Sequence, residues 1–282
     1  MLKQVKIECP AKLSLFLNIN GYDQSKQMHT VKIINQSINL YDIVYIQENL
    51  LKKDGIIIKI NNDILNDDTN NCYKAAKLFF DYTGITTNSL EIKIDKKIPN
   101  MAGLGGEDTD VAGILIGLDR YYQTNLTIKE LMTLGFQISA GVPYFIKMGC
   151  ALVTGYGEQV SKYLKNPYTR YLIIKPNISL NSKEMINKLN QNRLANKYIL
   201  ENILSNDFLS IVPEEVKNIR NVLSKYSGLE HSLSGCGPSY FIAFRKNILN
   251  LGVNAILKKE FPDYKFYDVV NTDYRKVLVK YK

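Results

Sequence analysis

The sequence predicts an α+β protein of two domains, and three features of the chain indicate this fold. Strand-length apolar segments dominate the chain up to residue 60, without the intervening helices that a repeated β-α-β pattern requires. Helical patterns follow in the middle of the chain. The stretch 177–209 is polar and rich in asparagine, which marks a change of character. We therefore expect domains at 1–159 and 160–282, each large enough to bury its own core.

Each expected element has its own local pattern. Apolar residues that alternate or run at strand length predict strands at 5–7, 13–19, 31–34, 43–47, 56–60, 90–94, 151–154, 171–175, 239–244 and 274–279. Apolar residues three and four positions apart predict helices at 71–82, 111–122, 127–138, 214–227 and 249–260. Asparagine and aspartate before the first helix can cap it, and Thr127 and Glu130 have the spacing of a capping box.

Composition excludes several classes of protein. Hydrophobic residues make up 45% of the chain and charged residues 22%, which is ordinary for a globular protein. No apolar run approaches the ~20 residues of a membrane helix, and the N-terminal segment lacks the apolar core of a signal peptide. The four cysteines are far apart and form no CxxC pair, which argues against a zinc site or a disulfide framework. We expect a reduced cytoplasmic protein with no membrane partner, as a monomer or homodimer.

The net charge of +9 favours anionic partners such as nucleotides, nucleic acids or acidic membranes. The lysines are nevertheless spread along the chain without a run of five or more, which argues against nucleic acid. A composition rich in Lys, Asn and Ile also arises from an AT-rich genome. Charge alone therefore does not identify the partner.

A glycine-rich loop at 98–110 lies between the predicted strand at 90–94 and a helical pattern that continues from Val111. Glycines let the backbone approach a ligand, and the first amides of a helix lack internal partners, so such a loop suits a phosphate. The loop also carries Glu107, Asp108 and Asp110. An unpaired carboxylate ~4 Å from a phosphate oxygen opposes binding by roughly 4 kcal/mol. Either Glu107 and Asp108 are first-turn charges favoured by the helix dipole, or Asp108 or Asp110 is a ligand of a magnesium ion.

Two further motifs accompany this loop in a fixed order. Residues 10–17 (PAKLSLFL) stand near the N-terminus, and residues 232–238 (SLSGCGP) stand near the C-terminus. Together with the loop, this set resembles the GHMP kinase superfamily. The stretches 142–145 and 155–158 are similar to those of its 4-diphosphocytidyl-2-C-methyl-D-erythritol kinases, so the resemblance covers nearly the whole chain. It implies an N-terminal ribosomal protein S5 domain 2-like domain, a C-terminal ferredoxin-like domain, and a nucleotide and substrate between them.

The resemblance also implies roles for individual residues. Lys12 corresponds to the catalytic lysine, which stabilises charge on the transferring phosphoryl group or lowers the pKa of the substrate hydroxyl. ATP and Mg²⁺ are the implied cofactors, and a small-molecule alcohol is the implied acceptor. The positions implied for ATP and phosphate are Asn71, Gly103, Leu104, Gly105, Gly106, Asp108 and Thr109. Those implied for the substrate are Ser14, His29, Gly235 and Gly237. Asp108 is also the expected metal ligand.

Four functional regions depart from the family pattern. The family places its catalytic aspartate in a Gly-Ala-Asp-Val-Pro stretch, where this chain has Gly141. Loss of a positioned general base typically lowers the rate by about 10²- to 10⁴-fold. Residues 107–109 replace the loop's serines, and Ser14 replaces a common asparagine. Met28 and the pair at 185–186 stand where two aromatic rings usually sandwich a cytosine, an arrangement that contributes ~1–3 kcal/mol per base.

These departures leave three functions open. The first is a kinase of the non-mevalonate isoprenoid pathway that uses Mg-ATP to phosphorylate 4-diphosphocytidyl-2-C-methyl-D-erythritol, with Lys12 acting without an aspartate base. The second is a catalytically degenerate homologue that binds a ligand or a protein partner. The third is a kinase for another small alcohol. Micromolar binding of Mg-ATP would count against the second function, and a screen for ADP release would reveal the third.

Overall fold

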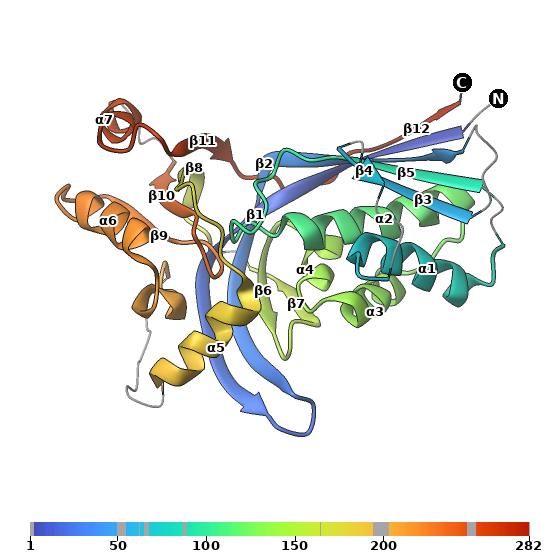
Figure 1. The fold of residues 1–282 in the computed structure, drawn as a ribbon, viewed down its shortest axis with the longest axis horizontal. Coiled ribbons are helices and arrows are strands. Elements are labelled where there is room, and N and C mark those ends of the chain that lie inside the picture. The colour runs from blue at the N-terminus through green and yellow to red at the C-terminus, as the bar shows by residue number, and fades with distance from the viewer. Residues whose placement is uncertain are drawn as a thin grey trace.

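Figure 1 shows the computed structural model of the protein, which describes residues 3–49, 55–61, 63–64, 68–86, 89–163, 165–193, 203–246 and 252–281. An eight-stranded sheet occupies one end of the molecule, with helices α1 to α4 lying along one side of it. A four-stranded sheet and helices α5 to α7 form the other end. This arrangement confirms the predicted α+β class.

The first sheet has the strand order β12-β1-β2-β5-β3-β4, and β6 extends it by pairing with β2 and β7. Its neighbouring strands are antiparallel except for β3 and β5. The strands are β1 (Lys3–Asp23), β2 (Met28–Glu48), β3 (Gly55–Ile60), β4 (Asp63–Ile64), β5 (Ser89–Asp95), β6 (Cys150–Thr154), β7 (Gln159–Lys162) and β12 (Val277–Tyr281).

The β1–β2 hairpin is longer than the sequence predicts. The four strands expected at 5–7, 13–19, 31–34 and 43–47 form two strands of 21 residues each. The register between them shifts at Pro10/Ala11, Ser14/Phe16 and Ile19/Gly21. A β-bulge bends a strand without ending it, so the polar interruptions in the sequence mark bulges rather than loops. The hairpin thereby reaches from the first sheet to the far side of α5 (Figure 1).

Helices α1 (Asn71–Thr83), α2 (Gly106–Tyr122) and α3 (Ile128–Ile138) confirm the three helices expected in the first half, and α4 (Val142–Lys147) follows them. The side chain of Asn70 caps α1 by accepting hydrogen bonds from two backbone amides. Both hydrogen bonds of the predicted capping box at Thr127 and Glu130 are present. Local capping therefore determines where these helices begin.

The second sheet has the order β11-β8-β10-β9 and is antiparallel throughout. Its strands are β8 (Tyr168–Lys175), β9 (Glu230–Leu233), β10 (Tyr240–Arg245) and β11 (Lys265–Val270). Its helices are α5 (Ser182–Arg193), the 3-10 turn η1 (Asp207–Ser210), α6 (Glu214–Leu223) and α7 (Val253–Glu260). Helix α6 is shorter than expected because it ends at Leu223, the last buried residue of its apolar face. The predicted start of the last helix, 249–251, lies outside the described residues.

A hydrophobic cluster joins the two ends of the molecule. Ala11, Leu13 and Leu15 of β1 pack with Tyr171 of β8 and Phe241 of β10, and all five are fully buried. The second sheet lies within 168–270, whereas β12 pairs with β1 in the first sheet. The division of the chain at residue 160 stays a prediction.

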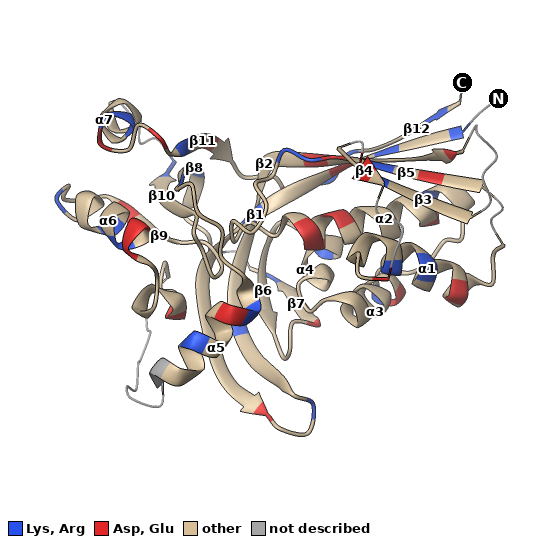
Figure 2. Cartoon of the chain, viewed as in Figure 1, with Lys and Arg blue, Asp and Glu red and all other residues tan. Residues whose placement is uncertain are grey.

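Charged residues are spread over the whole described structure, and the cysteines are unpaired. Figure 2 shows Lys and Arg distributed over helices and strands at both ends, interspersed with Asp and Glu. All four cysteines are free, and three of them are buried. In the described ranges, no helix is long and apolar enough to cross a membrane.

Candidate functional site

Lys12 lies on β1 at the point where both glycine-rich loops meet the strand. Side chains two positions apart point to the same face of a strand, so Lys12 and Ser14 are neighbours. The Lys12 ammonium donates hydrogen bonds to Ser14 Oγ at 2.9 Å and to the Gly103 carbonyl oxygen at 2.7 Å. The Lys12 backbone N–H donates to the carbonyl oxygen of Leu104 at 2.9 Å. The lysine therefore holds the first loop through both its backbone and its side chain.

The loop that precedes α2 needs glycine for backbone conformation and for space. Gly103 and Gly105 have φ values of +75° and +74°, which L side chains rarely adopt. A Cβ on Gly103 would lie 2.1 Å from the carbonyl oxygen of Ser234 and 2.8 Å from that of Gly237. A Cβ on Gly105 would lie 2.5 Å from the ring of Phe145. The first loop is therefore packed directly against the second, at 234–238.

The second loop reaches the same lysine from the other end of the molecule. Ser234 Oγ donates to the Gly103 carbonyl at 2.9 Å, and a Cβ on Gly235 would lie 2.9 Å from the Lys12 ammonium. The buried side chain of Asn206 donates to the Gly235 carbonyl at 2.8 Å. The structure thus brings together the predicted residues Lys12, Ser14, Gly103, Leu104, Gly105, Gly235 and Gly237. Ser234 was not predicted, although it lies inside a motif that was.

Burial lowers the pKa of Lys12 to about 8, while the Cys236 and Asp108 side chains partly offset this shift. None of the ion pairs in the described part of the chain includes Lys12. An ammonium group that is poorly solvated and has no bound counter-ion favours the arrival of an anion. The electrostatics of Lys12 therefore suit a phosphate.

The first turn of α2 is acidic, and Figure 2 shows its red segment where the loop enters the helix. Glu107 is exposed and accepts a hydrogen bond from Asn71 Nδ2 at 2.6 Å, which brings the predicted adenine-contacting residue to the loop. Asp108 is half-buried. Burial raises the pKa of Asp108, and a hydrogen bond from the Ser139 side chain partly opposes this shift. The two carboxylates of this turn therefore have different surroundings.

Asp110 is paired within the protein. Lys96 Nζ lies 2.6 Å from Asp110 Oδ2 and 2.5 Å from Asp42 Oδ2, and the three side chains are 10%, 3% and 0% exposed, respectively. The same ammonium donates to the Gly106 carbonyl at 3.3 Å, and Asp42 Oδ1 accepts from the backbone N–H of Ile98 at 2.8 Å. This buried triad anchors the loop at both ends, a function that the sequence pattern did not reveal.

Thr109 follows the glycine-rich loop, in the first turn of α2. It is fully buried, and its hydroxyl forms no hydrogen bond in the described structure. Its backbone N–H donates to the Gly105 carbonyl at 3.0 Å, which is an ordinary helical bond. A role for Thr109 in phosphate binding stays a prediction.

His29 is the second residue of β2, close to the turn of the β1–β2 hairpin, and it contacts Asn190 of α5. Figure 1 shows this part of the hairpin near α5. The register partner of His29, Tyr22, is ten positions beyond Lys12 on β1, roughly 30 Å along a strand that rises ~3.3 Å per residue. His29 Nε2 is 3.2 Å from Asn190 Nδ2, and its Nδ1 is buried without a hydrogen-bond partner in the described structure. The Tyr22 ring, which is 54% exposed, has its centroid 4.9 Å from that of His29.

The pair at 185–186 lies on α5. Met185 is 5% exposed and packs in the core of the second end with Leu189, whereas Ile186 is half-buried. A contact between this pair and a base stays a prediction. Tyr22 is the aromatic residue on this part of the hairpin, and its position opposite His29 in the antiparallel register was the signal that could have identified it.

Gly141 immediately precedes α4 and lies against Asp108 in the first turn of α2. Its backbone has φ −82° and ψ −22°, an ordinary right-handed conformation. A Cβ at this position would lie 2.1 Å from Asp108 Oδ2 and 2.7 Å from Asp108 Cγ. The side chain of Asp108 thus occupies the space beside Gly141.

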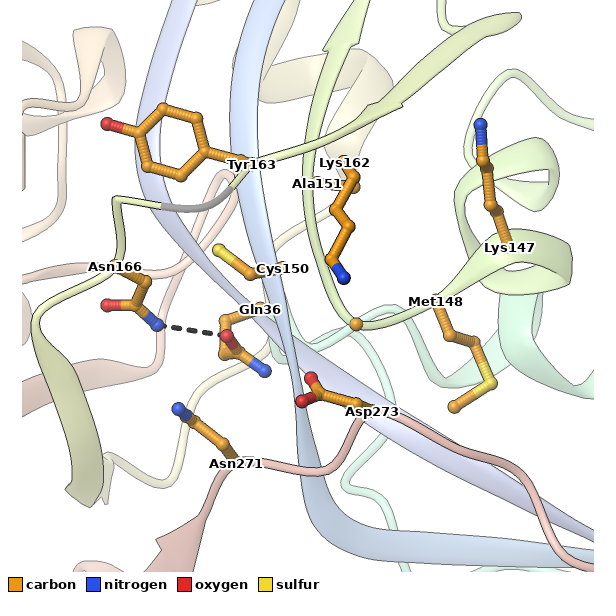
Figure 3. A pocket seen from close by; sticks show the side chains of 11 residues that line it. Gln36, Lys147, Met148, Cys150, Ala151, Lys162, Tyr163, Asn166, Asn271 and Asp273 are labelled. Carbon is orange, nitrogen blue, oxygen red and sulfur yellow. Dashed lines mark hydrogen bonds between the residues drawn. The ribbon is translucent and has the colours of Figure 1, made fainter.

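A cavity of about 480 Å³ lies elsewhere in the molecule (Figure 3). Its lining includes Gln36, Cys150, Asn166 and Asp273, and Asn166 donates to Gln36 across it at 2.9 Å. None of the predicted site residues lines this cavity. The described side chains also contain no group of three or more His, Cys, Asp or Glu residues that could hold a metal ion.

Known proteins are similar to this chain in sequence and in fold. Residues 70–149 match the family described as GHMP kinases N terminal domain. A 4-diphosphocytidyl-2-C-methyl-D-erythritol kinase of Clostridioides difficile is 32% identical, over 98% of this chain and 97% of its own length. One of Clostridium tetani is 35% identical, over 84% of this chain and 90% of its own length.

Two solved structures show the same fold. A crystal structure of 4-(cytidine 5'-diphospho)-2C-methyl-D-erythritol kinase has a TM-score of 0.69 at 19% identity, covering 95% of this chain and 100% of its own. The mevalonate kinase of Methanococcus jannaschii has a TM-score of 0.70 at 18% identity, covering 95% of this chain and 98% of its own. These likenesses confirm the two-domain GHMP kinase fold. The chain belongs to the GHMP kinase superfamily and, within it, to the family of 4-diphosphocytidyl-2-C-methyl-D-erythritol kinases.

Proposed function

We propose that the protein is an ATP-dependent kinase that phosphorylates the free hydroxyl of 4-diphosphocytidyl-2-C-methyl-D-erythritol in isoprenoid biosynthesis. One observation carries this proposal: the Lys12 ammonium lies between two glycine-rich loops, 2.7 Å from the Gly103 carbonyl and beside Gly235. A relative that bears this kinase name matches the chain over 97% of its own length, which supports the choice of substrate.

The chemistry follows from charge and position. In phosphoryl transfer, negative charge spreads over the oxygens of the transferring group, and catalysis is mostly positioning and electrostatic stabilisation. The Lys12 ammonium supplies a positive charge at the junction of the loops, and the first amides of α2 supply hydrogen-bond donors for phosphate. Ser14 accepts a hydrogen bond from the Lys12 ammonium, and Ser234 donates one to the Gly103 carbonyl. The two serines therefore hold the ammonium and the carbonyl that bond to each other.

The nucleotide of such a kinase would bring a magnesium ion. Mg²⁺ is usually held by one or two carboxylates together with substrate phosphates rather than by a cage of protein ligands. The first turn of α2 carries the carboxylates of Glu107 and Asp108, which are donors of this kind. Bound Mg²⁺ would neutralise phosphate charge beside these carboxylates. The specific role of Asp108 as its ligand stays a prediction, as do the cytoplasmic location and the oligomeric state.

The test is formation of the phosphorylated product from ATP and 4-diphosphocytidyl-2-C-methyl-D-erythritol with purified protein and Mg²⁺. We expect turnover, and we expect Lys12→Ala to lower it by at least about 10²-fold, as loss of a transition-state donor does. Lys217→Ala, at an exposed lysine of α6, serves as the control.

Other outcomes identify the alternatives. Absence of product from folded wild-type protein would contradict the proposal. ADP release with a different alcohol would then indicate a kinase for another substrate, and failure to bind Mg-ATP would indicate a degenerate, ligand-binding homologue.

A further inference from the structure

The glycine at position 141 is not required by its own backbone. Its φ and ψ lie in the right-handed region, which any L residue adopts. The residue precedes α4 and offers no side-chain cap, although aspartate is a favoured residue at a helix N-cap. The constraint is space, because a Cβ here would lie 2.1 Å from Asp108 Oδ2. Glycine at 141 is therefore explained by the side chain of Asp108.

The two positions compete for one carboxylate site. The Cγ of an aspartate at 141 would lie about 1.5 Å from its Cβ. Asp108 Cγ already lies 2.7 Å from that Cβ, with its two oxygens at 2.1 Å and 3.3 Å. Two carboxyl groups cannot share this volume. The space next to the α3–α4 junction therefore holds one carboxylate, which this chain supplies from α2 rather than from residue 141.

The surroundings of Asp108 suit a group that meets a ligand. The two other acidic side chains of the loop have partners, because Glu107 is bonded to Asn71 and Asp110 is paired with Lys96. Asp108 has no ion pair within the described part of the chain and has a hydrogen bond to Ser139. Asp108 stands in the first turn of α2, directly after the glycine-rich loop whose Gly103 carbonyl accepts a hydrogen bond from the Lys12 ammonium. One loop thus contacts the ammonium at Gly103 and leads to the carboxylate at its end.

We propose that Asp108 is the catalytic carboxylate of this kinase, replacing an aspartate at position 141. The assignment rests on the proposed function. The substrate hydroxyl oxygen attacks the γ-phosphorus of ATP, and a new P–O bond forms. The bond between the γ-phosphorus and the β–γ bridging oxygen breaks, so ADP leaves with that electron pair. The hydroxyl proton passes to a carboxylate oxygen of Asp108, which balances the reaction without a further reactant.

This assignment changes the meaning of two departures from the family pattern. Gly141 and Asp108 are 33 positions apart in the sequence. Taken separately, Gly141 is a lost base and Asp108 is an added charge near phosphate. In the structure the two residues are neighbours. The carboxylate that the family carries at position 141 is supplied here from position 108. The protein therefore keeps a carboxylate as proton acceptor in the space beside residue 141.

The reciprocal exchange tests the proposal. Asp108→Ser should lower kcat by about 10²- to 10⁴-fold, as loss of a general base does, and change KM for ATP little. Gly141→Asp alone should lower the Tm because two carboxyl groups overlap. The double variant Asp108→Ser/Gly141→Asp should have a higher Tm than Gly141→Asp. Its kcat should be at least tenfold higher than that of Asp108→Ser. Asp81→Asn, at an exposed carboxylate of α1, is the control. Asp108→Asn keeps the side-chain shape and should lower kcat without a change in Tm.

Each failure has its own signature. If the wild type is active and the variants Asp108→Ser and Asp108→Asn have the same kcat as it, the assignment is overturned. The proposed function is then left intact. An inactive wild type would overturn the proposed function and this assignment with it. Loss of activity in Asp108→Ser that excess Mg²⁺ restores would show a metal ligand and overturn the assignment. A folded double variant whose kcat is no higher than that of Asp108→Ser would contradict the inference that positions 108 and 141 share one carboxylate site.

Discussion

Removal of the ammonium from the buried Lys96 triad should destabilise the protein strongly, and Lys96→Met is the appropriate change because it keeps the length of the side chain. Lys96 Nζ lies within 2.6 Å of both Asp42 and Asp110, and both carboxylates are at most 3% exposed. Without the ammonium they face each other in a poorly solvated place. Breaking a buried charge network by removing one partner costs about 3–5 kcal/mol.

This free energy corresponds to a measurable loss of stability. For a chain of this size, about 1 kcal/mol lowers the Tm by roughly 2–4 °C, so the expected shift is roughly 6–20 °C. Burial already raises the pKa of Asp110 in the wild type, and removal of the Lys96 charge raises it further. A carboxyl group with a raised pKa in the folded state costs stability once pH exceeds its unfolded pKa. The loss in Lys96→Met should therefore grow as pH rises above about 4.

The assay is urea unfolding followed by circular dichroism, since the chain contains no tryptophan to report by fluorescence. Lys217→Met removes an exposed ion pair with Glu214 and should change stability by less than about 1 kcal/mol. Lys96→Met/Asp110→Asn should recover much of the loss, because one of the two uncompensated carboxylates is gone. Equal stabilities for Lys96→Met and Lys217→Met would refute the reasoning, as would a double variant no more stable than Lys96→Met.

Three further outcomes are expected. Because burial lowers the pKa of Lys12 to about 8, kcat/KM should fall above about pH 8, and Lys12→Arg should remove that limb of the profile. The limb in kcat should lie at higher pH because bound phosphates favour the charged lysine. Gly103→Ala should abolish turnover and lower the Tm more than Gly84→Ala, since both have positive φ but only Gly103 has neighbours within 4 Å. His29→Ala should raise KM for the cytidine substrate and leave kcat nearly unchanged, and an unchanged KM would contradict its role.

Local patterns in the sequence predicted the elements that carry the site. The capping box at Thr127 and the strand, loop and helix order around Gly103 are set by residues close together in the chain, so the sequence contains the information. The long hairpin was predicted as separate strands because β-bulges and loops both interrupt an apolar pattern. Fold class followed from such patterns, whereas the pairing of β12 with β1 depends on residues at opposite ends of the chain.

The contacts within the site were harder to predict. The loop pattern leaves Asp110 either as a charge at the start of the helix or as a magnesium ligand. Its pairing with Lys96 depends on the direction in which the first turn of α2 leaves the loop. The contact between Asp108 and Gly141 depends on the packing of α2 against the α3–α4 junction, which no local spacing specifies. A motif compared position by position shows which residues differ from the family pattern. Whether two differences, such as those at 108 and 141, compensate one another depends on their contact in the fold.

The glycines of the two loops are weak indicators of catalysis, because packing alone requires them. Gly103 would clash with Ser234 and Gly237 if it carried a Cβ, whether or not a nucleotide binds. A homologue that had lost ATP would still need that glycine to join its two ends. The residues that distinguish an active protein are those that packing does not require. Lys12 keeps an ammonium whose pKa burial lowers, and Asp108 places a carboxylate beside a glycine with an ordinary backbone. Burial disfavours the charged form of both groups. A scaffold that binds no ligand would have no reason to maintain that cost in desolvation.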